Sequence, residues 1–496
     1  QTNNEYYIFY LNGLTTGYTI EDLLNLYTAK GDNEIIGIEI WQDEFYDYTI
    51  ELPEDENITD RDIRPLLKGT ITDKEIITSI VNTIKGCNEN KIDDIKLKRI
   101  FYNCFINTMD TTVDYNEENM DTFIITGDIP AMWLRDSTSQ IEHYLPFINE
   151  HEDLRKLFVG LINRQVFCIL HEPYANAFNK TGNGQKWDND ITKDSPWVWE
   201  RKYEIDSLCF PVRLIYKYWK KSNDSSFFNN EIRKVFYKII DLWKIEQNHF
   251  ESSDYSFQRL NCSPTDTLTN EGLGDPVSYT GMTWSGFRPS DDACKYNYLI
   301  PSNMFATVVL GYISEISEIV FKDNNLKSIA DELKHEIEEG INKFGIIHTE
   351  EFGDIYAYEV DGLGNYNLMD DANVPSLLSI PYIGYKDIDD EIYQNTRKFI
   401  LSKNNPYYYE GSVAKGIGSP HTPPEYIWHI SLSMQGLTTK NETEINNLVN
   451  TLINSDGNTG YMHEGFYCND SSKFTREWFA WSNSLFADFI YKKYIK

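Results

Sequence analysis

The chain has 496 residues and a formal net charge of −32 at pH 7, with 41% hydrophobic and 25% charged residues. These proportions are typical of a globular protein, and the length suits one large domain with a small one. The strong negative charge disfavours nucleic acid and anionic membrane surfaces as partners, because both carry phosphate. No run of about 18 apolar residues is found, so no transmembrane helix is expected.

The seven cysteines are spread along the chain, without a CxxC pair or a zinc-type spacing to histidine. Most lie in apolar helical patterns, as buried free thiols do, which argues against a disulfide scaffold but leaves one bridge open. No cofactor is expected, and we expect a monomer. The chain begins at Gln1, as it would after removal of a secretory signal or after trimming, and a secreted location is favoured over a cytoplasmic one.

Residues 1–72 differ from the rest of the chain. The segments 6–10 and 34–40 are rich in aromatic and β-branched residues, which predicts strands. An acidic loop follows at 53–57, and no chemical motif is present. We therefore expect a small N-terminal extension that is partly β.

From about residue 73 onward, apolar residues recur at helical spacing, and long segments rich in Gly, Pro and aromatic residues separate the predicted helices. About a dozen amphipathic helices alternating with long loops suit an all-α fold, the (α/α)6 barrel or toroid, over 73–496. The loops of such a toroid gather over one end. Helices are predicted over 92–109, 154–170, 208–219, 232–243, 304–319, 326–341 and 478–494, with shorter ones near 138–148, 375–382, 390–402, 425–437 and 443–453.

The first loop with chemical potential covers 126–137. Arg135 and Asp136 offer a charge-assisted donor and acceptor beside the apolar face of Trp133, a combination that sugar recognition needs. The alternative is an ordinary helix start capped by Asp136 or Ser137.

The second loop covers 197–207, where charged residues alternate. Glu200, Lys202, Glu204 and Asp206 would point to one face of an extended segment, and Glu204 and Asp206 are candidate substrate-binding residues. A solvated charge run is the alternative, although the two flanking tryptophans make it less attractive.

The third loop, 283–292, places Arg288 ahead of the adjacent acids Asp291 and Asp292. Arg288 is a candidate substrate-binding residue. A helix cap that also interacts with the helix dipole explains one aspartate but hardly both.

Two further loops hold histidine and glutamate. In 416–429, His421 and His429 have no third ligand at suitable spacing, so no metal site is expected. In 461–479, Glu464 lies between His463 and aromatic residues, where the pKa of a carboxyl group can be tuned.

Other catalytic motifs are missing: there is no GxSxG elbow, P-loop, Rossmann GxGxxG or HExxH. What remains is a set of loop carboxylates with aromatic residues and arginines. Glycosidic bond cleavage uses such groups, one carboxylic acid protonating the leaving oxygen while a carboxylate assists water or attacks carbon. An acid at 291 or 292 and a base at Glu464 would lie on different loops of the same rim.

From about residue 75 to the C-terminus, the chain resembles glycoside hydrolase family 125, the exo-α-1,6-mannosidases. The blocks occur in the expected order, and twelve-residue blocks rarely arise by chance. The blocks are GDIPAMWLRDST at 127–138, YANAFN at 174–179, SGFRPSDD at 285–292, GIGSPHTP at 416–423 and KFTREWFAW at 473–481.

The resemblance implies an (α/α)6 barrel, inversion of the anomeric configuration, no metal, and a mannose-containing oligosaccharide as substrate. It also implies a general acid at Asp291 or Asp292, with Asp291 slightly preferred, and a general base at Glu464. Exo action requires a pocket closed at one end, which loops 172–204 and 404–424 would provide. The residues expected around the terminal mannose are Trp133, Arg135, Asp136, Asn176 and His421.

Two other interpretations stay open. One is a different inverting glycosidase or a phosphorolytic enzyme on the same toroid, although no basic phosphate pocket is evident. The other is a glycan-binding toroid that has lost catalysis. Loss of the acid or the base would mark such a protein, and both candidates are present here.

Overall fold

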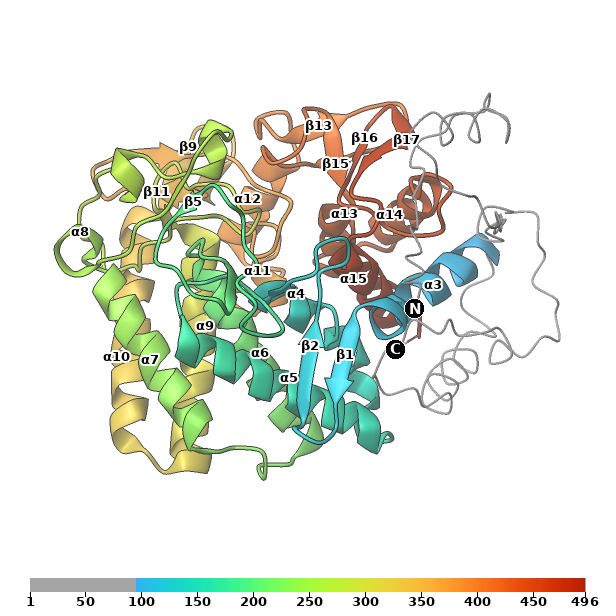
Figure 1. The fold of residues 1–496 in the computed structure, drawn as a ribbon. Helices are drawn as coiled ribbons and strands as arrows, with labels where there is room; N and C mark the ends of the chain where they lie inside the picture. The colour runs from blue at the N-terminus through green and yellow to red at the C-terminus, as the bar shows by residue number, and fades with distance from the viewer. Residues whose placement is uncertain (1–94, 496) are drawn as a thin grey trace, which may run out of the picture. The chain divides into compact units, whose positions relative to one another are not determined.

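The computed structural model describes residues 95–495 (Figure 1). The strands predicted at 6–10 and 34–40, the domain boundary at 72/73 and the start of the first predicted helix lie outside this part of the chain.

Between residues 95 and 495 the chain alternates six times between an outer helix and an inner helix (Figure 1). Inner helices contact one another around the ring: α15 contacts α4, α4 contacts α6, α6 contacts α9, α9 contacts α11, and α13 contacts α15. This is the predicted (α/α)6 barrel. The pairs, outer helix first, are α3 (Ile95–Thr111) and α4 (Leu134–Ser139), α5 (Glu152–His171) and α6 (Ile205–Ser222), α7 (Asn230–Glu246) and α9 (Ile300–Ile316), α10 (Asn324–Phe344) and α11 (Ile380–Ile383), α12 (Glu391–Ile400) and α13 (His429–Leu437), and α14 (Glu442–Asn454) and α15 (Ala480–Ile490).

The composition of each helix explains its place in the barrel. Every residue of the inner helix α15 is buried, and its polar residues are mostly small. The outer helix α10 buries a stripe that includes Leu326, Leu333 and Ile337 and exposes a charged face. Its N-cap Asp323 accepts a hydrogen bond from the Leu326 backbone N–H at 3.0 Å. A helix that is apolar or small all round is buried, whereas an amphipathic one covers a core.

One helical stretch of the barrel is unusually apolar. The stretch Ile300–Phe321, which joins α9 to a short π-helical turn η6 (Ser317–Phe321), is long and apolar enough by mean hydropathy to cross a membrane. More than half of its most apolar window is buried inside the protein, and α9 contacts α6 and α10. We therefore interpret it as a core helix of the barrel.

The prediction of one helix over 138–148 is wrong. α4 starts earlier, at Leu134, and ends at Ser139, and a separate 3-10 helix η3 (Glu142–Phe147) follows, with Pro146 inside it. The N-cap of α4 is Trp133, without a side-chain cap. Neither Asp136 nor Ser137 is the cap, and both lie in the first turn of the helix.

Short strands lead into three of the inner helices. β3 (Met132–Trp133) runs into α4, β8 (Tyr298–Leu299) into α9, and β15 (Tyr426–Trp428) into α13. Each belongs to a three-stranded antiparallel sheet: β3-β4-β6, β8-β11-β12 and β15-β16-β17. The partner strands are β4 (Ala177–Phe178), β6 (Val198–Glu200), β11 (Glu359–Val360), β12 (Tyr366–Asn367), β16 (Gly465–Tyr467) and β17 (Asp470–Thr475).

The remaining short strands and helical turns lie in the loops between the barrel helices. Two-stranded sheets pair β1 (Val113–Asn116) with β2 (Asp121–Ile124), β5 (Asp190–Ile191) with β7 (Gln258–Arg259), β9 (Ile346–Thr349) with β10 (Gly353–Tyr356), and β13 (Tyr408–Glu410) with β14 (Lys415–Ile417). Short helical turns are α8 (His249–Ser252), η4 (Pro264–Asp266), η5 (Asn270–Gly272) and the C-terminal η7 (Tyr491–Ile495).

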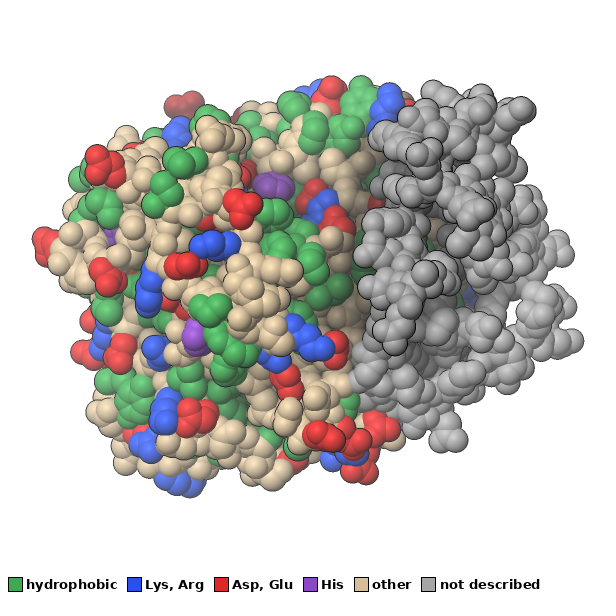
Figure 2. All heavy atoms as spheres, in the orientation of Figure 1, with side chains coloured by type: hydrophobic (Ala, Val, Ile, Leu, Met, Phe, Trp, Pro, Cys, Tyr) green, Lys and Arg blue, Asp and Glu red, His purple; other side chains and the backbone are tan. Residues whose placement is uncertain are grey.

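The six cysteines within residues 95–495 are free thiols, and five of them are buried. This agrees with the expectation of buried thiols, while Cys87 lies outside the described part. Acidic and basic side chains are interspersed over the face drawn in Figure 2, so no patch of one sign dominates that face.

Candidate active site

A small pocket is lined by residues from six separate stretches of the chain. It contains about 360 Å³ of empty space including its mouth. Two carboxylates on different loops, Asp291 and Glu464, belong to its wall. The full lining is Thr126, Ile129, Trp133, Arg135, Asp136, Ser290, Asp291, Asn373, His421, Trp428, Glu464, Arg476 and Phe479.

The pocket lies at the N-terminal ends of inner helices. Its wall includes Trp133, Trp428 and Phe479, which are the N-cap residues of α4, α13 and α15. The N-terminus of a helix carries partial positive charge and free backbone N–H groups. Several helix dipoles therefore favour anionic groups at this end of the barrel, which helps to explain why so many carboxylates gather there.

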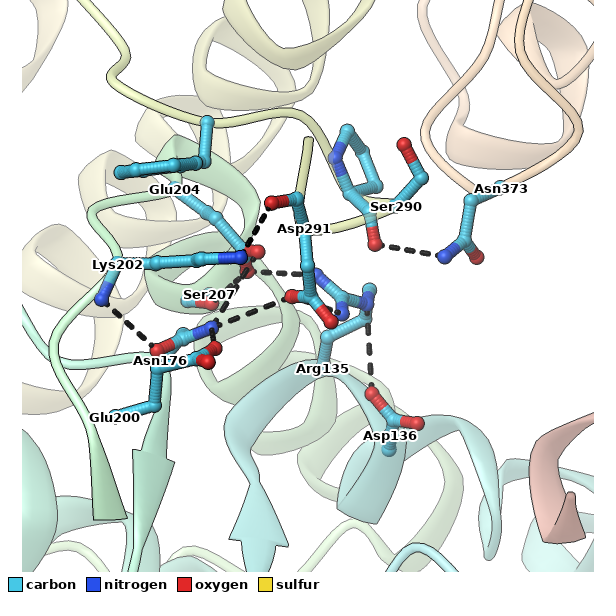
Figure 3. Close-up of polar contacts among 12 residues, drawn as sticks. Arg135, Asp136, Asn176, Glu200, Lys202, Glu204, Ser207, Ser290, Asp291 and Asn373 are labelled. Carbon is cyan, nitrogen blue, oxygen red and sulfur yellow. Dashed lines mark hydrogen bonds and ion pairs between the residues drawn. The ribbon is translucent and has the colours of Figure 1, made fainter. Parts of the chain in front are cut away.

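Arg135, in the first turn of α4, connects these carboxylates (Figure 3). Its Nη1 donates to Glu204 Oε2 at 2.7 Å and to Asp206 Oδ2 at 3.1 Å. Its Nε lies 3.4 Å from Asp136 Oδ2, and its Nη2 lies 3.7 Å from Asp291 Oδ1. The guanidinium is buried, so one cation contacts several buried carboxyl groups.

Asp291 projects from a tight loop held at several points. Its backbone is left-handed, with φ of 67°, a conformation that costs energy in most residues but is tolerated by aspartate. Arg288 N donates to Asp292 O at 2.7 Å, and the Arg288 guanidinium makes two hydrogen bonds to Glu359 of β11, at 2.6 and 3.0 Å. Lys202 Nζ donates to the Asp291 carbonyl at 2.7 Å. The loop is thus fixed to two neighbouring segments.

The two adjacent aspartates have different surroundings. The side chain of Asp291 is 27% exposed and lines the pocket, whereas Asp292 is almost fully buried and does not line it. Asp292 Oδ1 instead lies 3.1 Å from His421 Nδ1. Of the two, Asp291 therefore faces the pocket, and Asp292 contacts His421.

Glu464 lies directly before β16 and is positioned by the β15-β16-β17 sheet. Its side chain is buried except at the pocket. Arg476 Nη1 lies 3.7 Å from Glu464 Oε1, and Arg476 Nε is held by both oxygens of Asp128 at 3.1 Å. A carboxyl group in the wall of an open pocket can reach a water molecule there.

Burial and charge shift several pKa values in the site. Burial alone would raise the pKa of Asp291, but neighbouring cations outweigh it and lower this pKa to about 2. Those cations are Arg135, Lys202 and His421. Burial raises the pKa of Asp206 to about 6, although Arg135 opposes the shift. For His421 burial lowers the pKa, but the hydrogen bond and charge of Asp292 prevail and raise it to about 9.

Some buried polar atoms in the pocket wall have no hydrogen-bond partner. They include Trp133 Nε1, a donor, and Asp136 Oδ2, an acceptor. Buried polar groups are normally satisfied, and leaving one unpaired costs about 1–3 kcal/mol. A donor and an acceptor beside an apolar ring match the hydroxyl groups and the carbon face of a sugar.

The sequence candidates separate into two groups in the structure. The first group lines the pocket: Trp133, Arg135, Asp136, Asp291, His421 and Glu464. The second group is buried outside the lining: Asn176, Glu204, Asp206, Arg288 and Asp292.

Loop 404–424 contributes His421 to the pocket, whereas no residue of 172–204 lines it. The alternative of a solvated charge run at 200–206 is wrong, because Glu200, Lys202, Glu204 and Asp206 are all buried. The alternative of a helix cap for Asp291 or Asp292 fails as well, since α9 starts only at Ile300.

Four residues that line the pocket or hold its wall were not selected as candidates from the sequence. Arg476, Asp128 and Ser290 lie inside recognised blocks, and their charge or polarity was a usable signal. Asn373 was missed entirely. It lines the pocket, and its Nδ2 donates to Pro289 O at 2.7 Å. Its segment, 370–375, has two acids and a proline, which is a weak signal for a site.

The described residues form no metal-binding cluster. No group of three or more His, Cys, Asp or Glu side chains there is arranged to hold a metal ion. His429 is buried in a hydrogen-bond network with Ser455 and the His463 backbone, away from the pocket lining.

The chain is similar to known glycosidases. The glycoside hydrolase family 125 model, described as metal-independent alpha-mannosidase, matches residues 94–491. An alpha mannosidase from Streptococcus pneumoniae, solved in a non-productive substrate complex with alpha-1,6-mannobiose, is 45% identical, with a TM-score of 0.80 over 84% of this chain and 97% of that chain.

Two further relatives extend the comparison. The meiotically up-regulated gene 157 protein of Schizosaccharomyces pombe is 39% identical over 435 residues, which cover 83% of this chain and 85% of that protein. A bacterial glucoamylase complexed with acarbose is 11% identical, with a TM-score of 0.50 over 80% of this chain and 58% of that chain, so it shares the fold. The match over most of the chain, together with the site described above, makes this protein a glycoside hydrolase of family 125, the metal-independent alpha-mannosidases.

Proposed function

We propose that the protein is an exo-acting, inverting α-1,6-mannosidase that removes terminal mannose from α-1,6-mannosides, such as fragments of N-glycans or mannan. The observation that carries this proposal is the small pocket whose wall contains both Asp291 and Glu464. The linkage is supported by the Streptococcus pneumoniae relative, which was solved with alpha-1,6-mannobiose.

In this mechanism Asp291 protonates the glycosidic oxygen while Glu464 removes a proton from water. The oxygen of that water attacks C1 from the face opposite the leaving group, so the configuration at C1 inverts. An inverting pair needs its carboxyl groups roughly 6.5–9.5 Å apart, to leave room for water. Arg476, held by Asp128, lies 3.7 Å from Glu464 and pairs with its carboxyl group.

Other residues would bind and orient the sugar. Trp133 offers an apolar face and an N–H without a hydrogen-bond acceptor, and Asp136 offers an oxygen that is ion-paired with Arg135 but accepts no hydrogen bond. His421, whose pKa is raised to about 9, is protonated at neutral pH and can donate a hydrogen bond to a sugar hydroxyl. Neutral and charged donors together fix the ring in one orientation.

The test is hydrolysis of α-1,6-mannobiose followed by NMR in the presence of EDTA. We expect β-mannose to appear first, with the activity unchanged by EDTA. Glu464→Gln should lower kcat by about 10²–10⁴-fold, because it removes the general base. Glu339→Gln, on the exposed face of α10, is the matched control and should keep full activity.

The alternatives predict different results. If α-mannose appears first, the enzyme retains configuration and the inverting mechanism is wrong. If another linkage is cut and mannobiose is not, the substrate assignment fails although the fold stands. Loss of activity with EDTA would contradict metal-independent catalysis.

A further inference from the structure

The proposed mechanism requires a proton on Asp291, yet the free site holds this carboxyl as an anion. Three cations face it: Arg135, Lys202 and His421. Its pKa, lowered to about 2, leaves it almost fully ionised at neutral pH. A general acid in this state needs a nearby group that stores the proton until the substrate is bound.

Glu204 is the carboxyl placed to store it. It is the N-cap residue of α6 and is 1% exposed, without a place in the pocket lining. Glu204 and Asp291 share two donors: Asn176 Nδ2 lies 3.5 Å from Glu204 Oε1 and 3.4 Å from Asp291 Oδ1, and the Arg135 guanidinium contacts both carboxyls. Figure 3 shows the two side chains converging on this amide and this guanidinium.

The hydrogen bonds indicate which oxygen carries the proton. Glu204 Oε2 accepts from Arg135 Nη1 at 2.7 Å and from Ser207 Oγ at 2.8 Å, so it acts as an acceptor. Oε1 has only the long contact to Asn176. A proton on Oε1 can be donated to Asp291, and a hydrogen bond between the two carboxyl groups is part of what separates their pKa values. Burial raises the pKa of Glu204 well above its usual range, although Arg135 opposes this.

We propose, on the basis of the function above, that Glu204 and Asp291 share one proton and that Glu204 holds it until Asp291 transfers it to the glycosidic oxygen. Glu204 is thus a positioning residue for the proton, and Asp291 is the group that touches the substrate. When two carboxyl groups face each other in a buried site, ionising both costs free energy because the two negative charges repel. One proton therefore stays with the pair.

The proton balance of one turnover closes without any other reagent. Binding of the sugar displaces water from Asp291 and raises its proton affinity, so the proton moves from Glu204 Oε1 to Asp291. The O–H bond of Asp291 then breaks as the C1–O bond cleaves, and the leaving oxygen takes the proton. Glu464 gains a proton from the attacking water and releases it to solvent, from which the pair is reprotonated. While both carboxyls are ionised, nearby cations stabilise them: Arg135, Lys202 and His421.

The decisive variant is Glu204→Gln, which keeps the side-chain shape and hydrogen bonding of a protonated glutamate but has no transferable proton. We expect kcat on α-1,6-mannobiose to fall by about 10²-fold or more. Activity on 2,4-dinitrophenyl α-mannoside should fall less than about 5-fold, because its leaving group departs as an anion and needs no general acid. A structural role for Glu204 would lower both activities equally, and that result would overturn the proposal.

Two control variants separate this inference from the proposed function. Glu200→Gln alters a carboxyl that accepts from the same Asn176 amide at 2.8 Å, and it should change both activities by the same factor. Asp291→Asn should show the same leaving-group dependence as Glu204→Gln. If Asp291→Asn retains mannobiose hydrolysis, the proposed function fails. If Asp291→Asn loses it and Glu204→Gln does not, only the shared proton is wrong.

The pH profile gives a second readout. In Glu204→Gln the alkaline limb of kcat/KM for mannobiose should move to lower pH, because Asp291 then holds its proton alone among cations; an unmoved limb contradicts the proposal. The charged groups that face the pair are Arg135 and Asp136 from α4, Glu200 and Lys202 from β6 and the turn after it, Asp206 from α6, and His421 from the loop after β14.

A measurement on the wild-type protein is independent of whether the variant folds. With glutamate labelled by ¹³C at Cδ, we expect one carboxyl resonance at the protonated position at pH 7. Addition of mannose, which occupies the pocket, should shift it. Absence of any protonated glutamate at this pH would overturn the proposal.

Discussion

Asp292 shows how a single buried carboxylate sets the charge of a residue in the pocket. It does not reach the pocket itself, but it lies 3.1 Å from His421 Nδ1 and is the main reason that the pKa of His421 is raised to about 9 despite burial. The other acids that raise this pKa are Glu464 and Asp291. His421 is therefore protonated throughout the neutral range.

Asp292→Asn should lower the pKa of His421 by about 1–3 units, because an opposite charge within about 4–6 Å is lost while burial remains. His421 would then titrate within or near the neutral range instead of above it. A ¹⁵N-edited NMR titration of the imidazole measures this. Asp292→Glu, which keeps the charge, is the control. An unchanged titration in Asp292→Asn would show that Asp292 does not hold the charge of His421.

At the scale of single residues, the candidate carboxylates could be named from the sequence, but which of them faces the pocket could not. The blocks pointed to Asp291, Asp292 and Glu464, yet two adjacent aspartates cannot be ranked from their order in the chain. The left-handed φ of Asp291 and the ion pair between Arg288 and Glu359 decide which one faces the pocket. Glu359 comes from a strand 71 residues further along the chain. No local sequence pattern could therefore predict its contact with Arg288.

At the scale of the elements, two loops that are far apart in the sequence, around Gly127 and around Trp478, cross and hydrogen-bond to each other. Thr126 O accepts from Ala480 N at 3.1 Å, Asp128 N donates to Trp478 O at 3.3 Å, and Gly127 forms a bridge with Phe479. Gly127 has φ of 133°, and a Cβ there would lie 2.4 Å from Trp478 O. Only glycine fits this approach.

Gly127→Ala should destabilise the protein by about 1–3 kcal/mol from backbone strain alone, with a further loss from the clash, and should reduce kcat because the crossing holds Asp128 and Arg476. Gly184→Ala is the matched control, since Gly184 also has a positive φ, 74°, but no atom within 4 Å of an added Cβ. It should cost only about 1–2 kcal/mol and leave kcat unchanged. Denaturant unfolding and kcat measure both effects, and equal behaviour of the two variants would contradict the argument.

The long helices were predictable because apolar residues recur at helical spacing along each of them. Six of the seven long predicted helices match α5, α6, α7, α9, α10 and α15 to within a few residues, and the first matches α3 at its C-terminal end. Two-residue strands such as β3 and β4 were not predictable, since pairing between Trp133 and Ala177 depends on tertiary contact rather than on sequence period. These strands place Trp133 and Asn176, so the unpredicted elements are the ones that position the site.

For the molecule as a whole, buried neutral histidines link stability to pH. His429 accepts a hydrogen bond from His463 N at 2.9 Å through Nδ1, so this nitrogen carries no proton. Burial lowers the pKa of His429 to about 3. The unfolded chain binds a proton below about pH 6.5 and the folded one does not, so stability is fully present above that pH and is lost as the pH falls.

His429→Asn should flatten the pH dependence of the unfolding free energy by about 1.4 kcal/mol per pH unit between pH 5.5 and 4.5. Asparagine keeps an acceptor near the position of Nδ1 but does not titrate. Buried acids such as Asp206, whose pKa is raised to about 6, act in the opposite direction, so the difference from wild type is the quantity to measure. His335→Gln, exposed on α10, should match wild type. A variant slope equal to that of wild type would refute the assignment.

The loop crossing at Gly127 also has a consequence for biosynthesis. Asp128 and Arg476, whose ion pair holds Glu464 in place, are 348 residues apart, and the first described helix, α3, packs against the last inner one, α15. A ribosome therefore releases nearly all of the barrel before the wall of the pocket can form. A nascent or prematurely terminated chain that lacks Arg476 therefore has most of its helices but an unfinished pocket wall.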